Sequence, residues 1–119
     1  MNDLNTHAEA CAARVPASLG FDPITLIALF TQILPLITQC FARNDEADPA
    51  AMRANVRAQN ERAPEKLLKR TARRIRGEAD EKMSKAQSLV LAKAVIDHAC
   101  ESDDETVSTF ARACGRGDA

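Results

Sequence analysis

The chain has 119 residues and a formal net charge of −1, a length that holds one domain at most and leaves little room for a large enzyme cleft. Aromatic content is only 3%, so most of the apolar mass is Ala, Leu, Ile and Val, which is typical of helical cores. Four Gly and no Asn-Gly or Asp-Gly dipeptide argue against β-hairpins. We therefore expect an all-α fold, with one long hydrophobic, Pro-kinked helix, a basic helix and a C-terminal helical hairpin.

The first 21 residues are predicted to be an N-terminal arm. A short helix over residues 3–14 is rich in alanine, and Pro16 ends it. A loop built around Gly20 follows. Because this helix has few large apolar groups, we expect it to lie at the periphery.

Residues 22–42 form the hydrophobic helix. Asp22-Pro23 is a helix-start signal, an N-cap carboxylate followed by proline at the first helical position, and Pro35 predicts a kink. The twenty residues from Pro23 to Ala42 carry no charge, and a helix of this length is long enough to span a bilayer. Small and polar residues recur every three or four positions and form a stripe, the predicted self-association seam: Thr25, Ala28, Gln32, Pro35 and Gln39.

Three environments suit this helix. In a membrane the seam would face other copies, in a single-pass topology with the C-terminal part cytoplasmic or virion-interior. In a soluble cytoplasmic bundle or oligomer the helix would be central and buried on most sides. An interfacial position is less suitable, because such helices usually carry Lys or Arg on their polar face.

Residues 43–48 are a polar linker, and residues 49–119 form a second helical region. A helix from Pro49 to about Arg62 is interrupted by Pro64, which opens the basic segment 65–76. Its cations are predicted to contact anionic partners, either nucleic-acid phosphates or lipid head groups: Lys66, Lys69, Arg70, Arg73, Arg74 and Arg76. The alternative is a solvated face that pairs with acidic residues near the C-terminus, Asp103, Asp104 and Glu105 among them.

Two capping boxes mark the last helices. Ser84 to Gln87 precedes an apolar run over 89–96 that we expect at the centre of the core. Ser102 to Glu105 starts a predicted final helix that ends near Gly115.

Residue types that carry chemistry are few. His7 and Cys11 are four apart, and His98 lies close to Cys100, but a zinc site would require both pairs to meet in space. A Cys-His nucleophile pair, for example Cys100 or Cys114 with His7, is conceivable on composition but has no local signature. Cys11, Cys40, Cys100 and Cys114 form no paired motif and are expected to be free thiols. We predict no catalytic residues, metal, cofactor or small-molecule substrate.

The sequence thus predicts a non-enzymatic structural or interaction protein. The first hypothesis is a self-associating, membrane-associated component of a phage or bacterial assembly that presents a basic arm to anionic partners. The alternative is a soluble oligomeric helical bundle that binds nucleic acid or a protein partner. No helix-turn-helix, zinc-finger spacing or aromatic platform indicates sequence-specific DNA recognition.

Overall fold

The computed structural model describes residues 3–41, 49–79 and 82–101, with side chains described outside positions 3–4, 36–41 and 49–53. Its elements are α1 (Asp3–Ala12), the short 3-10 helix η1 (Ala17–Leu19), α2 (Pro23–Phe41), α3 (Pro49–Arg62), α4 (Pro64–Glu78) and α5 (Lys85–Glu101). These ranges contain no strand, so the all-α prediction is confirmed. The predicted final helix of the C-terminal hairpin lies outside the described residues.

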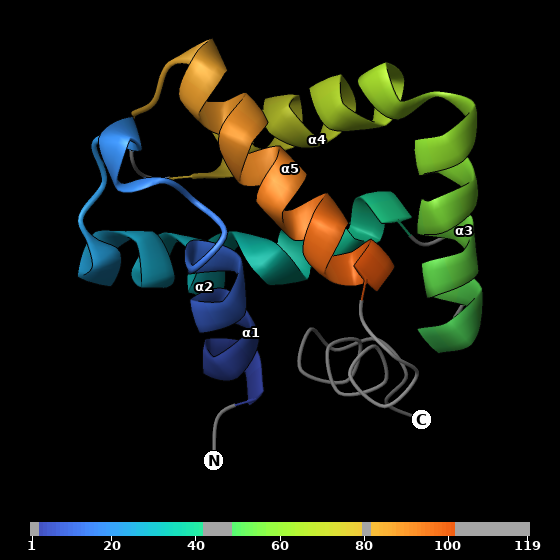
Figure 1. The fold of residues 1–119 in the computed structure, drawn as a ribbon, viewed down its shortest axis with the longest axis horizontal. Coiled ribbons are helices and arrows are strands. Elements are labelled where there is room, and N and C mark those ends of the chain that lie inside the picture. The colour runs from blue at the N-terminus through green and yellow to red at the C-terminus, as the bar shows by residue number, and fades with distance from the viewer. Residues whose placement is uncertain (1–2, 42–48, 80–81, 102–119) are drawn as a thin grey trace.

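The helices cross one another steeply instead of running side by side (Figure 1). In that view α2 and α4 run across the molecule at two levels, and α5 passes diagonally between them. The most extensive contacts join α4 to α5 and α1 to α2. The basic helix therefore rests on the apolar helix α5, and the N-terminal helix rests on the charge-free helix α2.

Helix starts follow the local signals in the sequence. The Thr25 amide donates to Asp22 Oδ1 at 2.6 Å, which is the N-cap contact expected before Pro23. At α5 the Gln87 amide donates to Ser84 Oγ at 3.0 Å, while the Ser84 amide donates to Gln87 Oε1 at 2.9 Å. This reciprocal pair is the predicted capping box. Pro64 occupies the first turn of α4, so it separates α3 from α4 as predicted.

Gly20 closes the connection between η1 and α2. Its φ of 101° lies in the left-handed region, and its amide donates to the Ala17 carbonyl. Glycine reaches this conformation without the steric penalty that a Cβ would bring. The loop predicted around Gly20 is thus a sharp turn.

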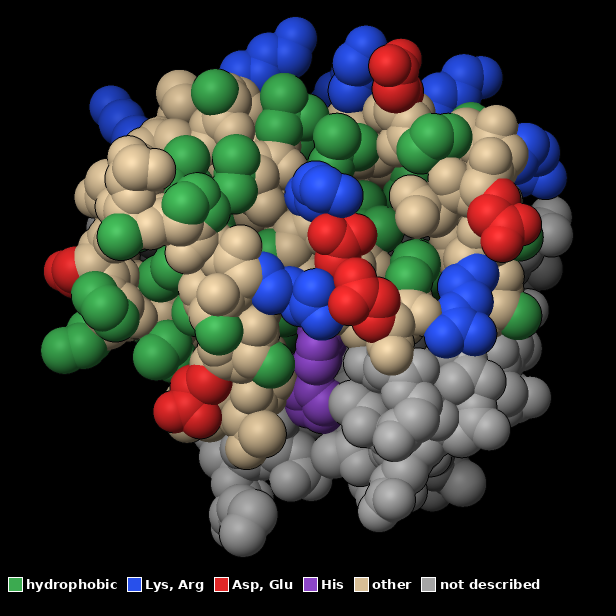
Figure 2. All heavy atoms as spheres, in the orientation of Figure 1, with side chains coloured by type: hydrophobic (Ala, Val, Ile, Leu, Met, Phe, Trp, Pro, Cys, Tyr) green, Lys and Arg blue, Asp and Glu red, His purple; other side chains and the backbone are tan. Residues whose placement is uncertain are grey.

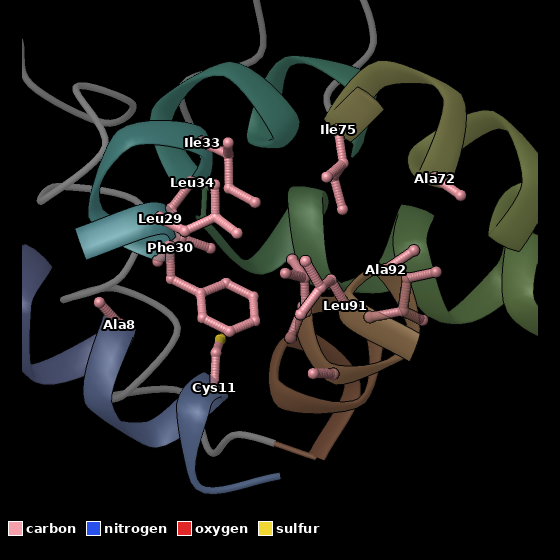
Figure 3. Close-up of a cluster of buried hydrophobic side chains, with 14 of the residues drawn as sticks. Ala8, Cys11, Leu29, Phe30, Ile33, Leu34, Ala72, Ile75, Leu91 and Ala92 are labelled. Carbon is pink, nitrogen blue, oxygen red and sulfur yellow. The ribbon is translucent and has the colours of Figure 1, made fainter. Parts of the chain in front are cut away.

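The core is assembled from all five α-helices (Figure 3). Phe30 is fully buried, and its ring lies between Cys11 of α1 and Leu91 of α5. Val56 of α3 and Ile75 of α4 are also fully buried. Side chains of α1, α2 and α5 therefore meet around Phe30, while α2 itself packs mainly on α1 and α4.

The position of α1 differs from the predicted peripheral arm. Ala8 and Cys11 have no exposed surface and belong to the core cluster, and His7 is buried as well. The small side chains that suggested weak packing instead allow α1 to lie close against α2. Helix α2 continues past Pro35 to Phe41, and the kink expected there stays a prediction.

Candidate functional site

The outward side of α4 carries the positive charge of the basic segment. Leu67, Thr71 and Ile75 form a buried stripe, because this side of the helix packs into the bundle. The basic face, as we name it, consists of the four exposed cations on the opposite side: Lys66, Lys69, Arg70 and Arg73. Figure 2 shows Lys and Arg side chains along the upper edge of the molecule, where α4 lies.

Arg74 and Arg76 are engaged within the fold. Arg74 Nε lies 3.5 Å from Glu78 Oε1, an ion pair one helical turn apart. Arg76 Nη1 donates to the buried Ser88 Oγ at 2.7 Å, which joins α4 to α5. Of the six cations predicted for partner binding, Arg76 therefore links α4 to α5, Arg74 pairs within α4, and the other four face outward.

The charges of the basic face are largely uncompensated. Among the described residues no ion pair joins Lys66, Lys69 or Arg73 to a carboxylate. Arg70 donates to the amide oxygen of Gln59 on α3, which orients its guanidinium without neutralising it. The alternative pairing with Asp103, Asp104 and Glu105 lies outside the described residues.

Two shallow hollows adjoin the basic face. One, of about 350 Å³, is lined by Arg70, Arg73, Arg74 and Gly77. The other, of about 160 Å³, lies where α3 meets α4 and includes Arg62, Lys66 and Arg70 in its lining. Arg70 lines both, so the cations surround depressions that an anionic group of phosphate size can enter.

The predicted self-association seam lies on the outward side of α2. Ala28 is exposed, and Thr25, Gln32 and Pro35 are half-buried, whereas the side chain of Gln39 is outside the described set. Gln32 Nε2 donates to the Glu78 carbonyl at 3.4 Å, so part of the stripe contacts α4 of the same chain. Self-association through this stripe stays a prediction.

Most of the described large apolar side chains of α2, within 23–35, are buried by other parts of the same chain. Leu26, Leu29 and Ile33 are at most 4% exposed, and Ile24 is the large hydrophobic side chain that stands out among the described residues, at 82% exposed. Within the described ranges, no helix combines the length and the apolar character needed to cross a membrane. The burial of these side chains favours the second of the three environments considered for this helix, the centre of a bundle.

A buried histidine pair joins α1 to α5, a contact that sequence reasoning left open. His7 Nδ1 lies 2.9 Å from His98 Nε2, and the two rings meet edge to face at a centroid distance of 5.1 Å. His7 is 4% exposed and His98 is 7% exposed. The sequence showed each histidine beside a cysteine, but their meeting spans 91 positions and has no local signal.

The electrostatic surroundings of this pair disfavour charge. Burial, together with the charges of His7 and Arg14, lowers the pKa of His98 from 6.5 to about 4, while Glu101 acts in the opposite direction. Arg14 and Glu101 form an ion pair at 3.3 Å between the end of α1 and the end of α5. The imidazole of His98 is thus suited to be neutral at pH 7, and one ring nitrogen of the pair donates to the other.

The thiols do not complete a metal or nucleophile site in the described part of the chain. Cys11 is buried in the core, and burial raises the pKa of the Cys100 thiol, which disfavours the reactive thiolate. No group of three or more His, Cys, Asp or Glu is placed to hold a metal ion within the ranges described. His7 and His98 meet, as a zinc site would require, but they do so as a two-member pair.

Comparison with protein families, with curated proteins and with solved structures finds no match to this chain.

Proposed function

We propose that this protein is a non-enzymatic binding protein that holds the phosphate backbone of a nucleic acid against the basic face of α4. The observation that carries the proposal is the exposure of four cations within eight residues on one side of a helix, without carboxylate partners among the described residues. From Lys66 to Arg73 the face extends about 10 Å along the helix axis. A DNA duplex presents one negative charge per about 1.7 Å of its axis, so the face can meet several phosphates at once.

We prefer nucleic acid over a lipid surface as the partner because of the side chains that surround the basic face. A helix that binds at a membrane interface usually places large apolar side chains beside its cations. On α4 the apolar stripe, including Leu67 and Ile75, is buried inside the bundle. The hollow between α3 and α4 beside the basic face is lined by Gln59 and Arg62 as well as by Ala63 and the buried Leu67, so among the described residues no large exposed apolar side chain stands in it.

The expected binding is independent of base sequence. The basic face contains only Lys and Arg, and the two described Phe side chains are buried or half-buried away from α4. Stacking on bases requires exposed aromatic rings, and specific groove recognition requires side chains that reach base edges. Contacts from this face therefore fall into the class that positions a protein on the backbone.

The salt dependence of binding tests the proposal. Four phosphate contacts on duplex DNA predict a slope of about −3.6 for the logarithm of the association constant against the logarithm of salt concentration. Affinity should then fall on the order of 100-fold between about 50 mM and about 200 mM salt. Fluorescence anisotropy of a labelled duplex of arbitrary sequence, titrated with the full chain, measures this slope.

Two matched double variants distinguish binding through the basic face from a general effect of positive charge on binding. Lys69→Gln with Arg73→Gln removes two charges from the face and should reduce the magnitude of the slope by about 1.8. Lys82→Gln with Lys85→Gln removes two exposed charges at and just before the start of α5 and should leave the slope unchanged. Equal effects of the two pairs, or no binding to the duplex at low salt, would refute the proposal.

A further binding experiment tests lipid as the partner. Vesicles that contain about one third phosphatidylserine are tested in the same salt series by co-sedimentation. Binding to these vesicles without binding to any duplex would replace the nucleic-acid proposal by the lipid alternative.

A further inference from the structure

The two hollows beside the basic face occupy equivalent positions along α4. The first, which we name the α3–α4 hollow, is lined from this part of the chain by Ala63, Lys66, Leu67 and Arg70. The second, which we name the α4 hollow, is lined by Arg70, Arg73, Arg74 and Gly77. Its lining positions repeat those of the first after seven residues, which is close to two helical turns. The two hollows therefore lie on the same side of α4, with centres about 10 Å apart along the helix axis.

Arg70 lies between the two hollows. Among the described residues it is the one that lines both. Its guanidinium donates to the amide oxygen of Gln59 on α3, and this contact uses one nitrogen of a group that carries five N–H donors. Because a guanidinium is planar and forked, its other donors point in different directions from one fixed position. Arg70 is thus placed to contact one anion in each hollow.

Other cations add positive charge to each hollow. Arg62 and Lys66 line the α3–α4 hollow beside Arg70, and Arg73 lines the α4 hollow. Lys69 is exposed on the same helix but lines neither hollow. The cations of the basic face are therefore not equivalent, because the two hollows share Arg70 and neither includes Lys69.

The separation of the two hollows is fixed by the packing of α4. The buried stripe of Leu67, Thr71 and Ile75 holds the helix on the bundle along the length that carries both hollows. A DNA duplex is also stiff, with a persistence length of about 50 nm, so it keeps its phosphates at fixed separations over a distance of about 10 Å. Two hollows at a fixed distance therefore favour a partner that presents two phosphates at a fixed distance, as a duplex does.

We propose that the basic face binds two phosphates of a DNA duplex, one in each hollow, and that Arg70 contacts both of them. This inference rests on the function proposed above, and it adds a role that depends on position as well as on charge. If charge alone decided the affinity, replacing Lys69 would weaken binding as much as replacing Arg70. With Arg70 shared by two phosphates, its replacement weakens binding more.

Two variants of equal charge test the role of Arg70. Arg70→Gln and Lys69→Gln each remove one exposed positive charge, so both should reduce the magnitude of the salt slope by about 0.9. At a fixed low salt concentration, the association constant for the labelled duplex should fall about tenfold or more in Arg70→Gln, because charged hydrogen bonds to two phosphates are lost. It should fall less than about fivefold in Lys69→Gln, since an exposed ion pair contributes little.

The outcomes separate this inference from the function on which it rests. Equal losses of affinity in the two variants would overturn the shared role of Arg70, while binding of the unsubstituted chain would still support a backbone-binding protein. No binding of the unsubstituted chain to the duplex at low salt would overturn both. Because both side chains are exposed, far-UV circular dichroism should show the same helical signal in both variants.

Arg70→Lys distinguishes the geometry of the guanidinium from its charge. The variant keeps the positive charge, so the salt slope should stay unchanged. An ammonium is a point charge that cannot contact both hollows at once, so the association constant should fall on the order of tenfold. Arg73→Lys is the matched control and should lose less affinity, because Arg73 lines one hollow. Full affinity in Arg70→Lys, or an equal loss in Arg73→Lys, would overturn the contact of Arg70 with two phosphates.

Discussion

The burial of Phe30 makes a quantitative prediction about the charge-free helix. Phe30→Ala removes a ring that is fully buried among side chains of α1, α2 and α5 (Figure 3). Because these neighbours belong to three different helices, they can close the resulting cavity only in part. The free energy of unfolding should fall by about 3 to 5 kcal/mol, the range for Phe→Ala in packed cores.

The total stability sets how this loss will be observed. At about 0.05 to 0.15 kcal/mol per residue, a chain of 119 residues has on the order of 6 to 18 kcal/mol. For most values in that range of stability the variant should still fold, but it should unfold at a markedly lower urea concentration than the unsubstituted protein. Because the chain has no Trp or Tyr, far-UV circular dichroism is the suitable probe of urea unfolding.

A second variant on the same helix is the control. Ile24→Ala removes an apolar side chain that is 82% exposed, so it should change the free energy of unfolding by less than about 0.5 kcal/mol. The urea m-value should be the same in all three proteins if the unfolded states are alike. A loss at Phe30 no larger than the loss at Ile24 would refute the burial of this side chain.

Three further predictions concern stability. Folding lowers the pKa of His98 from 6.5 to about 4, so between these pH values the unfolded chain binds more protons than the folded chain. The free energy of unfolding should therefore fall as pH decreases from 6.5 to 4, by at most about 3 kcal/mol and by less where solvent screens the site. Urea titrations that show no decrease across this range would contradict the lowered pKa of His98. Gly20→Ala should lower the free energy of unfolding by about 1 kcal/mol because of the backbone φ of 101°. Steric contact should add nothing, since the new Cβ would approach no atom closer than Gln87 Nε2 at 3.9 Å. An unchanged urea midpoint would mean that the turn relaxes. Ser84→Ala removes the acceptor of the Gln87 amide at the start of α5 and should cost about 1 kcal/mol, whereas the neighbouring exposed Lys85→Ala should cost much less.

Much of the local structure could be predicted from the sequence, because caps and breakers act over a few residues. Asp22 caps α2, Ser84 and Gln87 form the predicted box, and Pro64 separates α3 from α4. Each of these signals depends on backbone groups that are satisfied or removed within one helical turn. Helix identity and approximate bounds follow from them without knowledge of the tertiary fold.

The partner of each apolar surface could not be predicted in the same way. Twenty residues without charge meet the requirement of a bilayer and that of a protein core equally, and only the packing of α1 and α5 around Phe30 distinguishes the two. Alanine-rich α1 looked peripheral because its side chains are small. In the fold that smallness is what places Ala8 and Cys11 against α2.

The histidine pair shows a second limit of local reasoning. His7 and His98 are 91 positions apart, and each lies on a helix whose sequence gives no indication of the other. The spacing to Cys11 and Cys100 directed attention toward metal ligation, which requires four groups at one point. The fold instead brings together the two imidazoles in a buried hydrogen-bonded contact.

The basic helix shows how helical periodicity divides one cluster of charge into two roles. Arg74 follows the buried Leu67 by seven residues, and Arg76 follows the buried Ala72 by four, so both lie at the edges of the packed stripe. There Arg74 pairs with Glu78 of the same helix, whereas Arg76 donates to Ser88 of α5 and so contributes to holding α4 on the bundle. Lys66, Lys69, Arg70 and Arg73 lie on the opposite side, where the same packing keeps the helix fixed while leaving their charges accessible. Substitutions at Arg76 should therefore lower stability before they lower anion binding, and substitutions at Arg73 should do the reverse.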